Sequence, residues 1–509
     1  MHRRSLLGSL LAGLFGGALP RLVTPALAQE TPFSFDTVIA RARAAAAAPF
    51  AEPGMALTAP FADLPYDAYR GIRFRDEARV FAGGGFQMDL LPPGFHYDDR
   101  VEISVVSAGA ARPLAFSADL FSFDPAYFPW PDGRAPAGLA QDLGFSGFRL
   151  RHPINRPDVW DEFAVFQGAS YFRAVARDTL YGLSARGLAI GTAGPVPEEF
   201  PLFRSFWIEE PAPGATTLKL YALLDGPSVA GAYAFAITPG AETVMEIDAR
   251  LFPRVDINAA GIAPLTSMYF FGPESRRGID DFRDALHDSC GLWMITGAGE
   301  RLWRPLRNPQ KLEISAFADV DPQAFGLVQR FRDFEHYQDA ETRYEERPSA
   351  WIEPAGGWGA GLVTLIEIPT TDETNDNIVA FWRPQEPLRA GQERAYAYRL
   401  VWAPLPDDAL PLARVAATRT GRSIMAPHLD RVFVVDFDLG QIDVATVTPK
   451  LEATAGVATE LSVGPLPGGN LARVSFRFAP NGAAQTEFRL RLESAGRPAS
   501  ETWLYRWSA

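Results

Sequence analysis

Short apolar runs broken by turn residues dominate the sequence between residues 66 and 402, and they constrain the fold more than any other feature. Runs such as RVEISVVSA, TLKLYALLD and AGAYAFAIT alternate or stay apolar for four to eight residues. This is the period of β-strands, and the Gly, Pro, Asn and Asp residues between the runs are typical of turns. Because strands do not alternate with helices, the pattern predicts an all-β, mainly antiparallel domain, a sandwich or supersandwich rather than a (β/α)8 barrel.

Helical periodicity is scarce. The segment SFDTVIARARAAAAAPF predicts one helix, which Ser34 or Asp36 caps and Pro49 ends. A turn or two of helix is also expected at residues 279–287. At 509 residues the chain is long enough for two domains.

The C-terminal part predicts a second, smaller β-domain. Residues 404–422 are rich in proline and acidic residues and are interpreted as a linker after a domain at 29–403. In residues 471–494 two apolar–polar alternations flank an Asn-Gly pair, which predicts a β-hairpin with one buried face. Residues 423–509 are therefore expected to form an immunoglobulin-like sandwich, which either assists binding or serves only as a scaffold.

The N-terminus has the pattern of an export signal. Arg3 and Arg4 precede an apolar run, and Ala-Leu-Ala follows at 26–28. This predicts a twin-arginine signal peptide at 1–28, cleaved after Ala28, that exports an already folded protein. The apolar run is too short and glycine-rich to predict a membrane anchor, and no stable membrane insertion of the mature chain is expected. The formal charge of −13 argues against nucleic acid as a partner.

The sequence lacks the patterns that indicate disulfide bonds, metal sites or nucleotide binding. Cys290 is the only cysteine, so no intramolecular disulfide is expected, and a small buried thiol is the commoner role for such a residue. The sequence has no HExxH or CxxC pattern, no P-loop and no dinucleotide fingerprint. We therefore expect neither a metal site nor a cofactor.

Residues 279–382 combine aromatic side chains with two acidic loops. Five of the eleven tryptophans lie there, and the loops at 287–289 and 372–377 each adjoin a run that predicts a buried strand. Aromatic faces bind the C–H faces of sugars, and carboxyl groups can move a proton to or from a glycosidic oxygen. The residue types alone leave open which acids act, and most of the tryptophans are expected to be core. Asp376, between two apolar runs, is expected to be half-buried.

A set of motifs is similar to the periplasmic glucan biosynthesis protein G/D family. The likeness covers essentially the whole mature chain, and the motifs are specific when taken together and in order. The paired arginines favour the D type, although the resemblance alone does not decide between G and D. The motifs include YDAYRGIRF (66–74), FQGASYFRAV (166–175), HDS (287–289), FGLVQR (325–330), HYQD (336–339), RPSAWIEP (347–354) and EIPTTDETNDNIVAFW (367–382).

The resemblance implies a fold, a place and an activity. It implies a galactose mutarotase-like β-supersandwich joined to an immunoglobulin-like domain, a periplasmic location, and a role in making osmoregulated periplasmic glucans with a β-1,2-linked backbone. Family members also hydrolyse β-1,2-glucan internally with inversion, without a cofactor. This implies that Asp376 is the general acid and that Asp288 is the general base, which reaches its water through a proton relay.

The resemblance also implies that Glu373, Tyr344 and Arg347 line the substrate cleft. The alternative for Tyr344 and Arg347 is a surface ion-pair cluster with the neighbouring glutamates. Cys290 departs from the family pattern, in which a polar residue follows HDS, and the departure could alter the relay or the local packing.

Two other functions stay open at the level of sequence. The first is a transglycosylase that branches or cyclises the glucan, which would form new linkages or rings instead of shorter chains. The second is a non-catalytic glucan-binding partner of the inner-membrane glucan synthase, which would bind glucan without turnover.

Overall fold

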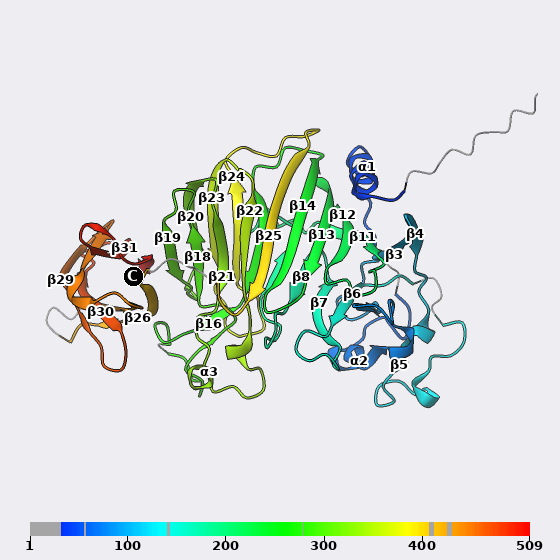
Figure 1. Cartoon of the computed structure of the whole chain (residues 1–509), viewed down its shortest axis with the longest axis horizontal. Helices are drawn as coiled ribbons and strands as arrows, with labels where there is room; N and C mark the ends of the chain where they lie inside the picture. The colour runs from blue at the N-terminus through cyan, green and yellow to red at the C-terminus, as the bar shows by residue number, and fades with distance from the viewer. Residues whose placement is uncertain (1–31, 55–56, 140–142, 277, 407–411, 425–429) are drawn as a thin grey trace, which may run out of the picture. The chain divides into compact units, whose positions relative to one another are not determined.

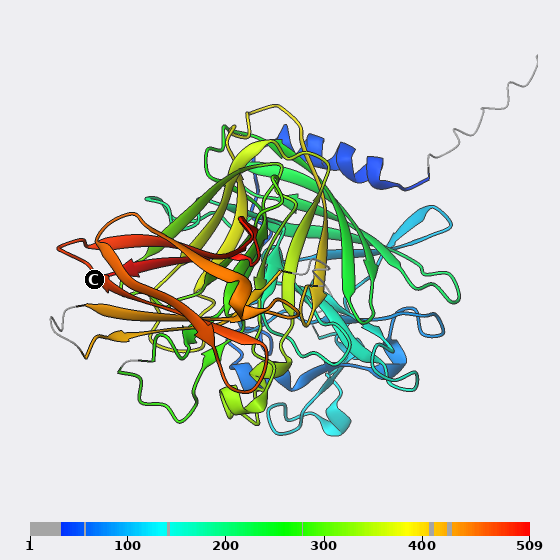
Figure 2. The ribbon, with the colours of Figure 1, turned by 60° about the vertical axis from the view of Figure 1, so that its left-hand side comes forward.

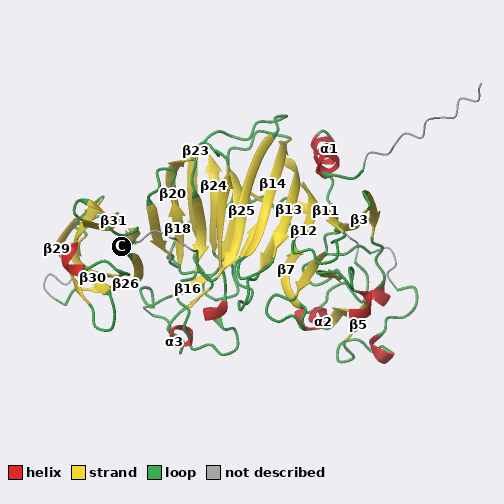
Figure 3. Ribbon diagram, in the orientation of Figure 1, coloured by secondary structure: helices red, strands yellow, loops and turns green. Residues whose placement is uncertain are grey.

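Strands make up most of the regular secondary structure, and the few helices are short (Figure 3), so the all-β prediction is confirmed. The computed structural model describes residues 32–54, 57–139, 143–276, 278–406, 412–424 and 430–509. The predicted signal peptide lies outside these ranges. Residues 33–509 form a single unit by their contacts. None of the described helices is long and apolar enough to cross a bilayer.

The first large sheet has ten strands and carries much of the candidate site at its strand ends. Its strands pair in an antiparallel manner. The order is β2 (Gln87–Leu91), β6 (Gly147–His152), β7 (Asp161–Gln167), β8 (Tyr171–Ala174), β9 (Ser184–Arg186), β15 (Ala260–Ser267), β24 (Ile378–Pro384), β23 (Ala360–Glu367) and β20 (Glu313–Val320), with β10 (Leu188–Ile190) also on β15.

The second large sheet has fifteen strands. Two of its pairings are parallel, β11 with β3 and β19 with β33, and the others are antiparallel. The order is β28 (Val447–Ala453), β31 (Gln485–Ser494), β33 (Thr502–Ser508), β19 (Arg301–Pro305), β18 (Gly291–Ile295), β21 (Ala324–Val328), β22 (Ser349–Ala355), β25 (Arg394–Ala403), β14 (Thr243–Pro253), β13 (Val229–Thr238), β12 (Leu218–Asp225), β11 (Leu202–Glu209), β3 (Glu102–Ser107) and β4 (Ala110–Pro113), with β32 (Arg497–Pro498) on β31.

Aromatic side chains from the two sheets pack against each other to form the main core. Phe148 of β6 packs edge-on against Phe206 of β11, with ring centroids 4.9 Å apart. Phe166 of β7 packs in the same way against Phe235 of β13 at 5.5 Å. Such edge-to-face contacts add to the burial of the rings, and truncating one of these phenylalanines would cost about 3–5 kcal/mol. The alternation read from the sequence thus places one face of each sheet in a shared core.

Helix α1 (Phe35–Ala46) forms where the sequence predicts a helix, and it lies against the second sheet. Ser34 begins it with a capping box. Val38 and Ala42 are fully buried in a small cluster with side chains of β11 and β13. Figure 2 shows the helix, in blue, beside green strands of the sheet. The helix ends before Pro49, which cannot continue it. Among the described residues, the other α-helices are α2 (Tyr66–Arg70) and α3 (Phe334–Tyr337).

The C-terminal strands form a sandwich around a second core, which also includes buried side chains of β18, β19, β22 and β25. Four strands, β26 (Arg414–Arg422), β27 (Arg431–Asp438), β30 (Leu471–Ala479) and β29 (Val457–Pro465), form one sheet. Their inner face packs on β31 and β33, for example Phe476 on Phe488 at 5.4 Å. The other layer is continuous with the second large sheet through β33. The division into domains stays a prediction.

Two local predictions in this region are wrong. The strands β30 and β31 both form, but they lie in different sheets instead of pairing as a hairpin. The alternation of apolar and polar residues does not distinguish a hairpin from two strands in facing sheets. In both arrangements the same apolar side chains of the two strands are buried. The predicted linker 404–422 contains strand β26 in its second half, since Val415 is buried and pairs with Phe437. Residues 407–411 of that linker lie outside the described ranges.

The expected helix at 279–287 is also absent. The chain forms a local turn there instead, in which the backbone N–H of Arg283 donates to the Asp281 carboxylate at 2.9 Å. Such side-chain bonds compete with helix formation. The segment then enters β17 (Leu286–His287), which pairs with β16 (Tyr269–Phe271). Two more strands, β1 (Ile72–Phe74) and β5 (Phe121–Phe123), form a separate pair (Figure 1).

Candidate active site

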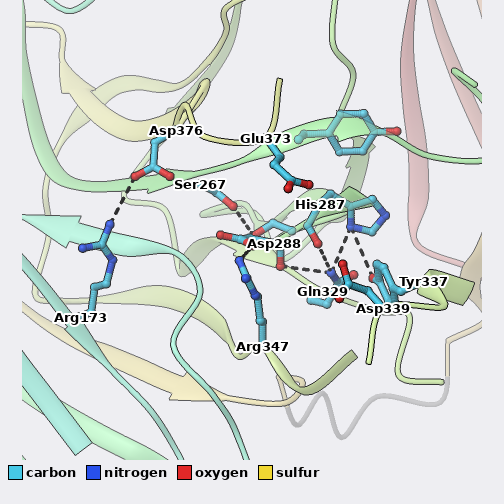
Figure 4. Close-up of polar contacts among 12 residues, drawn as sticks. Arg173, Ser267, His287, Asp288, Gln329, Tyr337, Asp339, Arg347, Glu373 and Asp376 are labelled. Carbon is cyan, nitrogen blue, oxygen red and sulfur yellow. Dashed lines mark hydrogen bonds and ion pairs between the residues drawn. The ribbon is translucent and has the colours of Figure 1, made fainter. Parts of the chain in front are cut away.

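The backbone of Asp288 is fixed on several sides where β17 ends. Its N–H donates to the carbonyl of Met268 at 2.9 Å. The Gln329 side chain, fully buried, donates to the carbonyls of His287 at 3.0 Å and Asp288 at 3.2 Å (Figure 4). His287 stacks on Tyr269 of the neighbouring strand at 5.2 Å. Burial lowers the pKa of His287 well below its usual value, which favours the neutral ring, and its Nδ1 lies 3.0 Å from Gln329 Nε2.

The Asp288 carboxylate is a buried charge with one strong partner. Its side chain is only 5% exposed, and Arg347 Nη1 donates to its Oδ1. The Arg347 guanidinium also lies over the ring of Tyr344, 4.0 Å from the ring centroid. Burial raises the pKa of Asp288 above its usual value; Arg347 opposes that shift, and the charge of Asp376 adds to it. Asp288 is thus more basic than an exposed aspartate.

Asp376 lies in the turn between β23 and β24, and its neighbour Asn377 holds that turn in place. Asn377 is 2% exposed. Its side-chain oxygen accepts from Tyr269 N at 2.8 Å, and its amide donates to the carbonyls of Tyr269 at 3.0 Å and Ile368 at 2.9 Å. Tyr269 belongs to β16, and β16 pairs with β17, the strand that ends immediately before Asp288. The Asn377 amide therefore ties the two acidic loops together.

Replacing Asn377 by alanine should therefore loosen the acidic turn. Three hydrogen bonds of a buried amide are lost and backbone groups of Tyr269 are left unpaired, so we expect a loss of about 2 kcal/mol in the free energy of unfolding. Urea denaturation measures it. The matched control is Asn375→Ala, two residues away and exposed, for which a change within about 0.5 kcal/mol is expected. Equal losses for both variants would contradict this role.

The Asp376 side chain is more exposed than the sequence predicts. It keeps 36% of its surface, and its Oδ2 lies 3.5 Å from Arg173 Nη2 of β8. The flanking apolar runs are buried strands, but the turn between them projects beyond the sheet. Figure 4 shows Asp376 beside Arg173 at the left of the view, with Glu373 above Asp288.

Glu373 is held by an arginine that the sequence analysis did not single out. Arg283 Nη1 lies 2.9 Å from Glu373 Oε2 and 2.9 Å from Asp339 Oδ2. Burial raises the pKa of Tyr344 to about 12, with Arg347 opposing the rise and Glu373 adding to it. The structure therefore brings the five predicted site residues into one region, and the Tyr344 and Arg347 side chains point inward instead of forming a surface cluster.

The tryptophans of this region are all core residues. Each of the five is at most 8% exposed, so none presents a face to a sugar. Cys290 is buried as well: its sulfur accepts from Arg330 N at 3.1 Å, and burial raises its pKa to about 11. A thiol with that pKa stays protonated at neutral pH and is not a nucleophile.

Sequence reasoning missed four residues that shape the site. Each lies in or beside a motif that carried the family resemblance, but nothing in the residue type marks it as part of a site. Their partners are far away in the chain, as in the 203 residues between Arg173 and Asp376. The four are Arg173, Arg283, Gln329 and Asn377.

Comparison with known proteins assigns the chain to a family. The model of the family described as "Periplasmic glucan biosynthesis protein, MdoG" matches residues 33–507. The chain belongs to this family. A glucans biosynthesis protein G of Vibrio cholerae is 45% identical over 485 residues, which cover 94% of this chain and 88% of that protein. The protein of the same name from Rhodopseudomonas palustris is 45% identical over 516 residues and covers all of both chains.

A third member of the periplasmic glucan biosynthesis family, the G protein of Shewanella frigidimarina, is 44% identical over 94% of this chain and 86% of its own. All three relatives carry the G name, whereas the paired arginines had favoured the D type. The family resemblance is confirmed, and with it a part in glucan biosynthesis.

Proposed function

We propose that the protein is a periplasmic, inverting endo-β-1,2-glucanase that trims the glucan backbone, with Asp376 as general acid and Asp288 as general base. The observation that carries the proposal is the convergence of these two carboxylates. They come from loops 88 residues apart in the sequence, and the charge of one raises the pKa of the other. Their environments differ, which is how a pair of carboxyl groups takes opposite roles.

In this mechanism Asp288 activates the attacking water. Its raised pKa makes it a stronger base, and Arg347 keeps it ionised and oriented. Because only 5% of its side chain is exposed, the water's proton reaches it through a short relay. Inversion leaves room for a water between sugar and base, with carboxyl groups typically ~6.5–9.5 Å apart, and a relay permits more.

Asp376 protonates the leaving oxygen. In the free protein it faces solvent, and its Oδ2 lies 3.5 Å from Arg173 Nη2. A glucan bound over the turn displaces that contact and excludes water from the carboxyl group that donates the proton. Glu373, Tyr344 and Arg347 contribute polar groups to the substrate from the opposite side of the pair.

The direct test of this function is release of reducing ends. The mature protein should shorten linear β-1,2-glucan and leave β-1,3- and β-1,4-linked glucans intact. If linear β-1,2-glucan is bound but never shortened, the proposal is wrong, and a binding partner of the glucan synthase becomes the better account. Products with new branches or rings would favour a transglycosylase.

Replacing Arg347 by methionine tests the base. Arg347 lowers the pKa of Asp288, so its removal should raise that pKa and keep Asp288 protonated to higher pH. The acidic limb of the pH profile of kcat/KM should therefore move to higher pH by about one pH unit or more. Arg343→Met, on the same turn but 48% exposed and paired with Glu346, is the control and should leave the limb in place. An unmoved limb in the Arg347 variant would remove Asp288 from the mechanism.

A further inference from the structure

A polar cavity of about 490 Å³ lies apart from the acidic pair, beside α2, β2 and β6. Its aromatic lining includes Tyr66, Tyr69 and Tyr97, and Tyr66 is 55% exposed. Aromatic faces together with polar side chains that can bond hydroxyl groups are typical of sugar sites. The remaining polar lining is Arg70, Arg73, Asp76, Arg79, Asp89, Arg149, Arg151 and Gln167.

The polar groups of the cavity are held in fixed positions. Asp89 is 4% exposed and lies 3.0 Å from Arg79 Nε and 2.7 Å from Arg151 Nε. The Gln167 amide donates to Tyr69 Oη at 2.7 Å and to Ser146 at 2.9 Å. A preorganised lining of this kind loses little side-chain entropy when a ligand binds.

Strand register places the cavity on the same face of the sheet as the acidic turn. Asp89 pairs with Arg149, Arg149 with Val165, and Val165 with Arg173 across four neighbouring strands. Directly paired residues share a face, so this row runs from the cavity lining to Arg173, which contacts Asp376.

The opposite face of the same strands is the core. Phe148, Phe166 and Phe172 alternate with the row and pair with one another in register, and each is at most 2% exposed. The polar row is therefore on the open side of the sheet. Arg149, which lines the cavity, is two strands from Arg173, or about 10 Å. An extended saccharide bound at Asp376 spans that separation within a few glucose units.

We propose that this cavity is a second carbohydrate site that holds a distal part of the same β-1,2-glucan chain. The inference rests on the proposed function, and it adds that long chains are preferred because they occupy both sites. Short oligosaccharides that fill only the region of the acidic pair do not reach the tyrosines.

The test compares two chain lengths with a variant that leaves the core intact. Tyr66→Ala removes an exposed ring that lies beside Phe95 and under the guanidinium of Arg70. Binding is measured by calorimetry in the Asp376→Asn background, with a long linear β-1,2-glucan and with a short β-1,2-linked oligosaccharide. We expect Kd for the long chain to rise about tenfold, ~1.4 kcal/mol, and Kd for the short one to stay unchanged. Tyr66→Phe should keep most of the affinity, since it keeps the ring.

The control is Tyr127→Ala, which removes a tyrosine of similar exposure, 48%, outside the cavity lining. It should change neither Kd. Unchanged long-chain affinity in Tyr66→Ala, or an equal loss for both lengths, overturns the second site. This failure is distinct from failure of the proposed function, because the latter is seen when the wild-type protein releases no reducing ends from either substrate.

Discussion

Replacing Asp376 by asparagine should lower kcat on linear β-1,2-glucan by about 10²–10⁴-fold, the usual contribution of a general acid. Asparagine keeps the shape of the side chain but has no proton to give to the leaving oxygen. Stability should change little, because Asp376 is 36% exposed and its single ion pair with Arg173 is long, at 3.5 Å. The loss should therefore appear in kcat with the denaturation midpoint unchanged.

Asp256→Asn is the matched control for this experiment. Asp256 is also an exposed aspartate paired with an arginine, Arg389, at 2.8 Å, but it does not lie in the acidic turn. Its replacement should leave kcat as in the wild type. Wild-type rates in the Asp376 variant would mean that the acid lies elsewhere.

Replacing Glu367 by glutamine should destabilise the strand that leads into the acidic turn by about 3–5 kcal/mol. Glu367, at the end of β23, is fully buried and lies 3.4 Å from Arg304 Nη2, a guanidinium only 1% exposed. Glutamine still accepts the hydrogen bond from Arg307 N, which is 2.7 Å from Glu367 Oε1. The loss in the free energy of unfolding therefore reports the cost of burying the Arg304 charge without the negative charge of Glu367. Chemical denaturation measures the loss.

An exposed ion pair provides the comparison. Glu393 is 36% exposed and pairs with Arg43 at 3.0 Å; Glu393→Gln should alter the free energy of unfolding by at most about 1 kcal/mol. If both substitutions have the same small effect, the buried pair does not stabilise this strand in the way its geometry suggests.

Local signals predicted local structure well. Ser34, the alanine-rich run and Pro49 placed α1, and apolar alternation placed most strands, because caps, turns and periodicity act within a few residues. Strand pairing could not be predicted in the same way. The residues of β30 and β31 alternate as in a hairpin, yet the two strands lie in facing sheets. The choice between these arrangements depends on which distant strands cover each face.

The candidate site shows the same limit. The motifs that carry the family resemblance pointed to Asp288 and Asp376, but burial could not be inferred from their neighbours: Asp288 is almost sealed and Asp376 is open. Arg173 and Arg283 join the site only because strands and loops far apart in the sequence meet there. The tryptophans were no guide, because aromatic composition does not distinguish a core from a sugar platform.

The configuration of the first product is the most direct measurement of the central claim. Linear β-1,2-glucan is incubated with the mature protein, and the new reducing end is followed by NMR before it mutarotates. Two carboxyl groups acting on opposite faces of one sugar predict shorter linear chains whose new ends are α-anomers. New ends that are first β-anomers, or products that are rings or branched chains, would contradict the account.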